Sequence, residues 1–500
     1  MPLRQRCYSP RPEEIPEPVT DRSPIPTLQK RVRLVFGVPL RTLAEDWIFV
    51  PLVCCAVLLF VWGMDVAAGS RVPASVLSML ILFFTLLLCT WIPIVQVKVD
   101  RMLVWTDPGV EWLLKWMTVM FSPALVVMPL QKGLEGREIG RVIGVFAVGY
   151  VVVLLLVIGM VKTVRRCMKL FRTSPDISTP QHDEIAIELD RRPSTTLSEK
   201  SQQAARPLLP RLPIHPSTLL IYISLFVPSL ALALLTDVVQ PLHLCITVLA
   251  YFVGLALPPK LKTVLHPLLV CGGLTILGVW CVGGMKGESL YEAIGTYSRS
   301  IKAQKLLTAL TSHKPFPTPG AGDVLYSLLD AAVVVLAIRM YKERVMLRQQ
   351  IVPIMTVIST VSIFSLVFHV WISRSTGMDR ENSLGMSCRF VTTPLSLQIF
   401  SSVLQDANAS LGVVMVIVSG MVGDVIGGWG MRRVGVSKDD VLVVGVTTGV
   451  TSHAVGTASL LGKNPQAAAL SSLTFVLFGT ASVVWVSIPI IAEEIRSLAV

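Results

Sequence analysis

Two short stretches near the C-terminal end of the chain place polar and ionisable residues in strongly apolar surroundings. The first, FVTTPLSLQIF, directly follows Arg389 and contains Thr392, Thr393 and Pro394. The second, GVTSHAVGTA, surrounds a histidine with hydroxyl groups and glycines, and its candidate site residues are Thr451, Ser452, His453, Gly456 and Thr457. Guanidinium, imidazole and hydroxyl groups can all donate to a small anion, and imidazole also exchanges a proton near neutral pH. These stretches predict anion binding, with His453 as a substrate donor or a proton carrier.

The local sequence of both stretches favours discontinuous helices. Pro394 suits the first turn of a helix, and Thr392 and Thr393 are residue types that cap one. The glycines around His453 permit close or left-handed backbone. In membrane transporters, half-helices direct free N–H groups at an anionic substrate near the midplane. Two alternatives stay open: small residues can serve only helix packing, and His453 can be a core histidine whose hydrogen bonds are satisfied.

Two carboxylates also occur within apolar runs. Asp330 lies in SLLDAAVVVLAIRMY and Asp424 in SGMVGDVIGGW. Ionisable groups within membrane spans are usually functional, so both residues are candidates for coupling transport to a cation, as is His453. For Asp424, a structural ion pair with Arg432 or Arg433 is an equal alternative.

The elements that carry these residues are membrane-spanning helices. Of the 500 residues, 52% are hydrophobic and 15% are charged, whereas soluble domains are about one quarter charged. The formal net charge is +12, but the Lys and Arg residues cluster in short loops between apolar runs. This pattern indicates cytoplasmic-side loops and argues against nucleic-acid binding. The nine cysteines show no metal-ligand spacing, and no cofactor is expected.

We predict an all-α polytopic membrane protein with about 11–13 transmembrane or re-entrant helices, since apolar runs of about 20 residues recur along the chain. Two of these segments, Phe390–Leu404 and Val441–Leu461, are discontinuous. The N-terminal spans are expected at about Trp47–Met64, Pro73–Val95, Trp112–Leu130 and Gly140–Val161. The later spans are expected at about Ser217–Thr236, Leu242–Leu257, Val264–Val282, Asp323–Tyr341, Ile351–Ile372, Leu411–Trp429 and Ala467–Ala492.

The chain divides into four parts by composition. Residues 1–46 are predicted to be a disordered cytosolic tail, 47–162 a four-helix membrane module, 163–216 a basic, Ser/Pro-rich linker and 217–500 a transport module. Basic residues place the tail and the linker on the cytoplasmic side of a multi-pass membrane protein. The basic segment Met431–Lys438 reaches that side only if one of the two discontinuous segments is re-entrant, which favours re-entry.

From Arg389 to its end, the chain resembles the LrgB/CidB membrane family. The residues that carry this resemblance are R-F-V-T-T-P-L-S-L and T-S-H-A-V-G-T-A, with HPLLVCGG and AVVVLAIRMYKERVMLR upstream. The first four spans resemble the LrgA/CidA family through VPASVLSMLILFF and FSPALVVMPL. The fused arrangement is similar to that of plant plastid translocators of glycolate and glycerate. One departure is Asp330–Ala331, where the family tends to have Gly-Pro.

The resemblance implies a secondary transporter of small 2-hydroxy or 2-oxo monocarboxylates such as glycolate, glycerate, lactate or pyruvate. Its partners would be the organic anion, a proton or counter-anion, and the lipid bilayer. Assembly into a homo-oligomer is left open. Bacterial relatives are alternatively described as holin/antiholin-like proteins that modulate membrane integrity, and this second function also stays open.

An intramembrane aspartyl protease is the strongest enzyme alternative. Residues 320–323 spell G-x-G-D and residues 123–125 spell P-A-L. Such a protease needs a second aspartate facing the first, so that the pair shares one proton. The order of the two motifs is reversed here, and the Tyr-Asp context of the second aspartate is missing. The sequence therefore predicts a transport protein and not an enzyme.

Overall fold

The computed structural model describes residues 48–68, 73–120, 122–130, 136–171, 216–262, 265–313, 315–461 and 463–500. Within these ranges the secondary structure is helical and contains no strand. Nine of the described helices are long and apolar enough to cross a membrane, and three shorter apolar helices accompany them. The predicted all-α polytopic membrane fold is therefore confirmed. The predicted tail and most of the predicted linker lie outside the described residues.

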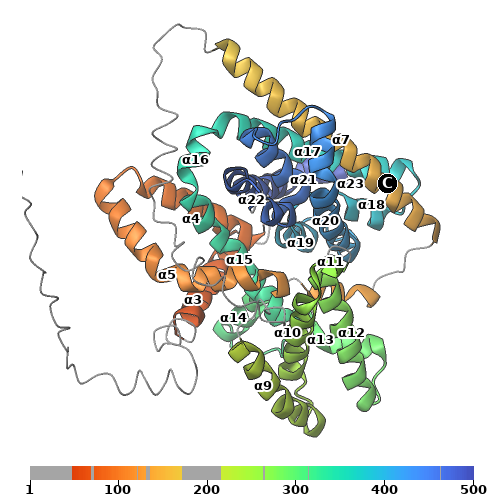
Figure 1. The fold of residues 1–500 in the computed structure, drawn as a ribbon. Coiled ribbons are helices and arrows are strands. Elements are labelled where there is room, and N and C mark those ends of the chain that lie inside the picture. The colour runs from red at the N-terminus through yellow and green to blue at the C-terminus, as the bar shows by residue number, and fades with distance from the viewer. Residues whose placement is uncertain are drawn as a thin grey trace, which may run out of the picture.

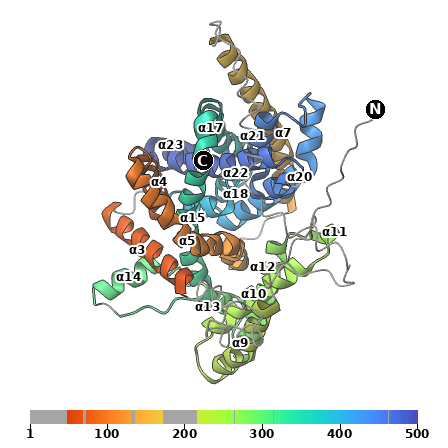
Figure 2. The same ribbon diagram turned by 60° about the vertical axis from the view of Figure 1, so that its left-hand side comes forward.

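The N-terminal helices separate into two places. Helices α3 (Val50–Ala68), α4 (Ala74–Cys89) and α5 (Pro93–Met120) pack against one another and against α15 (Ala321–Lys342). Helix α7 (Gly136–Phe171) instead packs against the C-terminal helices α17 (Ile351–Ser375) and α21 (Val441–Leu461) (Figure 1). A 60° turn of the molecule shows the same separation (Figure 2). One helix of the first four spans thus belongs structurally to the C-terminal bundle.

Helix α15 lies between the two groups of helices. It contacts α3, α4 and α5 on one side and α10 (Gln240–Ala256), α19 (Thr393–Ser402) and α22 (Pro465–Ser487) elsewhere. Its side chains are buried almost without interruption from Leu329 to Ile338. A helix that is apolar on all faces is stable only when it is surrounded by other helices, which explains this central position. Helices α9 (Pro216–Leu235), α10 and α12 (Pro267–Met285) form a neighbouring group, with the short helix α13 (Leu290–Tyr297) packed on α12. The short helix α14 (Ala303–Thr311) packs instead on α3 and α15.

The C-terminal bundle contains the two segments that the sequence marked as discontinuous. Its long helices are α17 (Ile351–Ser375), α20 (Ala409–Arg433) and α22 (Pro465–Ser487). Between them lie the short helices α18 (Arg380–Met386) and α19 (Thr393–Ser402), and the broken helix α21 (Val441–Leu461). The terminal helix α23 (Pro489–Ser497) packs against α22 and α17.

Helices α18 and α19 form a re-entrant hairpin, hereafter the first hairpin. Its two ends meet: Arg380 Nη2 lies 3.0 Å from Asp406 Oδ2, and the Asn408 amide donates to the Glu381 carbonyl at 2.9 Å. Residues 387–392 form the turn at its tip, and α19 starts with Thr392 at the N-cap and a proline in the first turn. The segment therefore enters the bundle and returns to the same end, here named the Asp406 end.

Helix α21 is a second hairpin, folded at His453. The backbone of His453 has φ 36° and ψ −130°, which interrupts the helix. Gly456 packs back on Thr448 and Ser452, so the two halves run antiparallel. At the base, Asn464 Nδ2 donates to the Lys438 carbonyl at 3.3 Å. The segment returns to the end where it started, here named the Lys438 end.

The two hairpins enter from opposite ends of the bundle. Helix α20 connects them, since it starts beside Asn408 and ends just before Lys438. The tip of the first hairpin carries Arg389 and the tip of the second carries His453. Non-helical backbone inside a membrane is tolerated where protein or a lined cavity satisfies it. The sequence favoured one re-entrant segment, and the described structure has two hairpins of this kind.

Candidate functional site

Arg389, at the tip of the first hairpin, is fully buried. Its Nη1 donates to the backbone carbonyls of Phe146 at 2.8 Å and Val145 at 3.3 Å. The guanidinium carbon lies 4.0 Å from the centroid of the Phe146 ring and 4.6 Å from that of Phe390. Nε and Nη2 have no partner, and no carboxylate of the described residues pairs with this side chain. A buried cation without a counter-charge is costly, and an anion beside it would offset that cost.

Two buried histidines lie near Arg389. His453 is 4% exposed and its Nε2 has no hydrogen-bond partner in the described structure. His369 of α17 is fully buried; its Nδ1 lies 2.6 Å from the Ser365 carbonyl, and its Nε2 has no partner among the described residues. Because a carbonyl can only accept, Nδ1 carries the proton and Nε2 is left as an acceptor in the neutral ring. The charge of Arg389 acts on both rings.

Tyr150 of α7 completes the group that we name the Arg389 cluster, namely Tyr150, His369, Arg389 and His453. Its ring packs 6.1 Å from that of Phe390, and its hydroxyl has no partner among the described residues. Thr451 and Ser452 lie nearby without reaching hydrogen-bond geometry. The cluster thus combines unpaired polar atoms from α7, α17 and both hairpins in one buried region.

Most of the predicted hydroxyl residues of the two hairpins are buried, and some of them bond backbone carbonyls. Thr392 and Thr393 are buried at the start of α19, and the Thr392 side chain makes no cap bond. Thr451 Oγ1 donates to the Thr447 carbonyl at 2.8 Å, and Thr457 Oγ1 donates to the His453 carbonyl at 2.6 Å. Hydroxyls of this kind satisfy backbone carbonyls, which is the packing role that the sequence left open. Ser452 lies against Gly423 and Gly456, so it connects α20 with the second hairpin.

A cavity of about 530 Å³ opens at the Lys438 end. We name it the Lys438 vestibule. Gly423, Thr448 and Gly456 line it beside Ser452, and its other lining residues include three cations, Arg432, Lys438 and Lys463. Asp424 also lines this vestibule, and neither Arg432 nor Arg433 forms an ion pair with it among the described residues. Asp439 is a second carboxylate in the lining, so the three cations leave a formal net charge of +1 (3 − 2), which favours anions at this end.

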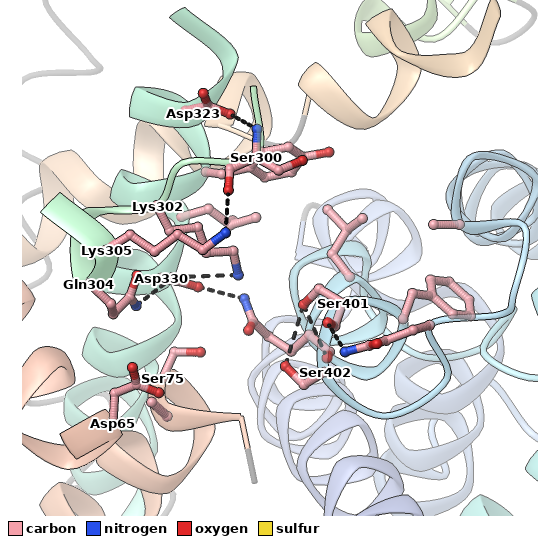
Figure 3. Close-up of a pocket in the computed structure, with 18 of the residues that line it drawn as sticks. Asp65, Ser75, Ser300, Lys302, Gln304, Lys305, Asp323, Asp330, Ser401 and Ser402 are labelled. Atoms are coloured by element: carbon pink, nitrogen blue, oxygen red, sulfur yellow. Dashed lines mark hydrogen bonds and ion pairs between the residues drawn. The ribbon is translucent and has the colours of Figure 1, made fainter. Parts of the chain in front are cut away.

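A cavity of about 640 Å³ lies at the Asp406 end and contains Asp330 (Figure 3). The Asp330 carboxylate is buried and accepts from Gln398 Nε2 at 2.7 Å and Gln304 Nε2 at 2.9 Å, with Lys302 Nζ at 3.7 Å. Gln398 belongs to α19, so Asp330 connects α15 to the first hairpin. Figure 3 shows Lys302 and Gln304 directed at Asp330 from the neighbouring segment.

Asp323 lines the same cavity but has a structural role. Its carboxylate accepts from the backbone amides of Arg299, Ser300 and Gly320 and from Ser298 Oγ, at 2.9–3.0 Å. These bonds hold the segment before α14 against the start of α15. The G-x-G-D sequence is accounted for by this anchoring role, and Asp323 and Asp330 are held by separate sets of donors.

Two members of the Arg389 cluster were not predicted from the sequence. His369 is an ionisable residue inside the apolar run of α17, and that signal alone would have marked it as a candidate. Tyr150 carries no such signal, because its relevance depends on α7 packing against α17 and α21. Arg389 and His453, which are 64 positions apart (453 − 389), lie at adjoining hairpin tips.

The fold and the site define an integral multi-pass membrane protein in which two opposed hairpins enclose a buried cation. Residues 247–492 match the model of the LrgB-like family. This part of the chain, which contains α15 and both hairpins, therefore belongs to the LrgB-like family. No solved structure matches the chain significantly.

Known relatives differ in how much of the chain they cover. Plastidal glycolate/glycerate translocator 1 of Arabidopsis thaliana is 24% identical over 444 residues, which are 87% of this chain and 77% of the relative. An uncharacterized protein of Haemophilus influenzae is 29% identical over 216 residues, 42% of this chain and 89% of the relative. The holin-like protein CidB of Staphylococcus epidermidis is 24% identical over 170 residues, 34% of this chain and 72% of the relative.

Proposed function

We propose that this protein is a secondary transporter of small 2-hydroxy or 2-oxo monocarboxylates, with the substrate carboxylate bound at Arg389 between the two hairpin tips. The observation that carries the proposal is the buried Arg389 guanidinium, which has two free nitrogens and no counter-charge among the described residues. An anion that binds there neutralises the charge and accepts from the guanidinium. The printed name of the plant relative supports glycolate and glycerate as candidate substrates.

The positions of the two cavities suit alternating access. The Lys438 vestibule reaches the second hairpin, and the cavity at the Asp406 end that contains Asp330 reaches the first. The Arg389 cluster lies buried between these two cavities. A substrate can then bind at a fixed site while one hairpin at a time gives access, as in transporters with broken helices at the midplane. We assign the Lys438 end to the cytoplasm, because Arg432, Arg433, Lys438 and Lys463 gather there.

His453 is our first candidate for proton coupling. It lies at the tip of the second hairpin, it is buried beside Arg389, and its free Nε2 can take or release a proton as the substrate binds. Asp330 is the second candidate, because its carboxylate holds Gln398 of the first hairpin. Asp424 is the third, through its place in the Lys438 vestibule.

Exchange in liposomes tests this function. Purified protein is reconstituted in liposomes loaded with unlabelled glycolate, and uptake of labelled glycolate, glycerate, lactate and pyruvate is measured with and without a pH gradient. We expect saturable uptake that accelerates with internal substrate. The relative named as a holin-like protein favours a pore as the second candidate function. Linear, non-saturating leak of all four acids would support that pore and refute the carrier.

A further inference from the structure

Helix α7 lies outside the LrgB-like match, which begins at residue 247, yet it holds the bases of both hairpins. At the Asp406 end, Glu138 accepts from the Asp379 amide at 3.1 Å and from Asn382 Nδ2 at 2.9 Å. At the Lys438 end, Arg165 forms a two-bond ion pair with Asp440 at 3.0 and 2.9 Å. A helix that is fixed to both hairpins is in a position to shape the space between their tips.

The middle of α7 contacts the Arg389 cluster directly. Its carbonyls at Val145 and Phe146 accept from Arg389, and the Phe146 ring stacks on the guanidinium. Gly149 allows the closest approach, because a Cβ atom there would lie 2.5 Å from His369 Nε2 and 3.0 Å from Arg389 Nη1. One helical position further on, Tyr150 is 3% exposed and its hydroxyl lacks a partner among the described residues.

We propose that α7 forms one wall of the transport site and that the Tyr150 hydroxyl binds the second oxygen of the substrate, the one on the carbon next to the carboxylate. The inference rests on the proposed function and makes it more specific. It assigns substrate selectivity to a residue outside the LrgB-like part of the chain.

The chemistry of the cluster favours Tyr150 for this role. A 2-hydroxy acid presents a donor and an acceptor, whereas a 2-oxo acid presents only an acceptor. A phenol hydroxyl can accept from the first and donate to the second without a change of charge. His369 lacks this ability in its neutral form, because its protonated nitrogen is used by the Ser365 carbonyl. A site that hydrogen-bonds a substrate oxygen discriminates against an analogue that lacks it, since the protein group is then left unpaired.

The test compares glycolate with acetate, which has the same carboxylate but no second oxygen. Tyr150→Phe keeps the ring and removes only the hydroxyl. We expect its preference for glycolate over acetate, measured as the ratio of uptake rate to half-saturating concentration, to fall about tenfold. Acetate uptake should not fall and can rise, because acetate leaves the Tyr150 hydroxyl unpaired. The matched control is Tyr341→Phe, which removes a buried hydroxyl that donates to Asp100 at 3.1 Å, away from the cluster.

A second pair of variants tests the wall itself. Gly149→Ala adds a methyl group that must displace His369 or Arg389, so uptake of both acids should fall at least tenfold. Gly144→Ala, on the same helix, adds a methyl group with no atom within 4 Å and should transport normally. An unchanged glycolate preference in Tyr150→Phe, or normal uptake by Gly149→Ala, would overturn the inference. If the unaltered protein takes up neither acid, the proposed function itself fails.

Discussion

His453 combines a left-handed backbone, with φ 36°, and a buried imidazole nitrogen that has no partner in the described structure. Such a conformation costs about 1–3 kcal/mol for a residue other than glycine and is found mainly where function requires it. Its place at the tip of the second hairpin, beside Arg389, allows its protonation state to depend on the substrate charge. This residue is therefore where we expect proton coupling to be most sensitive to substitution.

We predict that His453→Gln separates exchange from coupling. Glutamine keeps a hydrogen-bond donor but cannot titrate near neutral pH. Glycolate exchange at equal pH on both sides should persist, whereas acceleration by an imposed pH gradient should disappear. His243→Gln replaces a buried histidine of α10 outside the cluster and should keep the full response. A full response of His453→Gln would move the coupling role to Asp330 or Asp424.

The residues that could be predicted from the sequence are those with a local signal. Arg389 lies about one helical turn before a helix start with proline, and His453 lies among glycines, so both were recognisable without a structure. Tyr150 was not, because its role depends on helix packing between distant parts of the chain. The hydroxyls of Thr451 and Thr457 bond backbone carbonyls, and composition alone could not separate that role from substrate binding.

Each hairpin starts and finishes at the same end of the bundle. We therefore predict that the two bases of one hairpin face the same side of the membrane, which cysteine labelling can test. In a variant whose native cysteines are replaced by serine, Ser437→Cys and Lys463→Cys should react with a membrane-impermeant thiol reagent from the same side. Asp379→Cys and Gln405→Cys should both react from the opposite side. All four positions are exposed. Labelling of positions 437 and 463 from different sides would show that α21 spans the membrane.

The sequence predicted where the helices break but not how far they return. The Gly/Ser/Thr content of the α21 segment and Pro394 in α19 marked both breaks. The charge pattern favoured only one re-entrant segment. The basic segment Met431–Lys438 reaches the cytoplasmic side if one of the two discontinuous segments is re-entrant. The second re-entry follows from contacts such as Asn464 with the Lys438 carbonyl, and from Gly449 lying against Thr474 of α22. Pair contacts of this kind leave no periodic pattern in the sequence.

In the whole molecule, α15 joins the N-terminal group of helices to the C-terminal bundle, and α7 belongs to that bundle. Helices α3, α4 and α5 pack on α15, whereas α7 packs on α17 and α21. The family match covers residues 247–492, so the site draws on both sides of that boundary. The segment between Phe171 and Pro216, most of the predicted linker, lies outside the described residues, and we propose that it is dispensable for transport.

We predict that two separate chains reproduce transport. Residues 1–172 co-expressed with residues 212–500 should assemble through the Arg165–Asp440 and Glu138–Asn382 contacts and retain glycolate exchange. Residues 212–500 alone lack Phe146 and Tyr150 and should exchange glycolate at least tenfold more slowly. An assembled but inactive pair would show that covalent linkage matters, and full activity of the second chain alone would show that α7 is unnecessary.

The affinity of Arg389 variants for glycolate tests the central claim most directly. Arg389→Lys keeps the charge but loses the planar fork that binds a carboxylate through two bonds. We expect its half-saturating glycolate concentration in liposome exchange to rise about 5- to 150-fold, which corresponds to roughly 1–3 kcal/mol. Arg348→Gln, at an exposed position of the short helix α16 (Arg344–Gln349), should behave like the unaltered protein. A half-saturating concentration that is unchanged in Arg389→Lys would contradict the assignment of Arg389 as the carboxylate site.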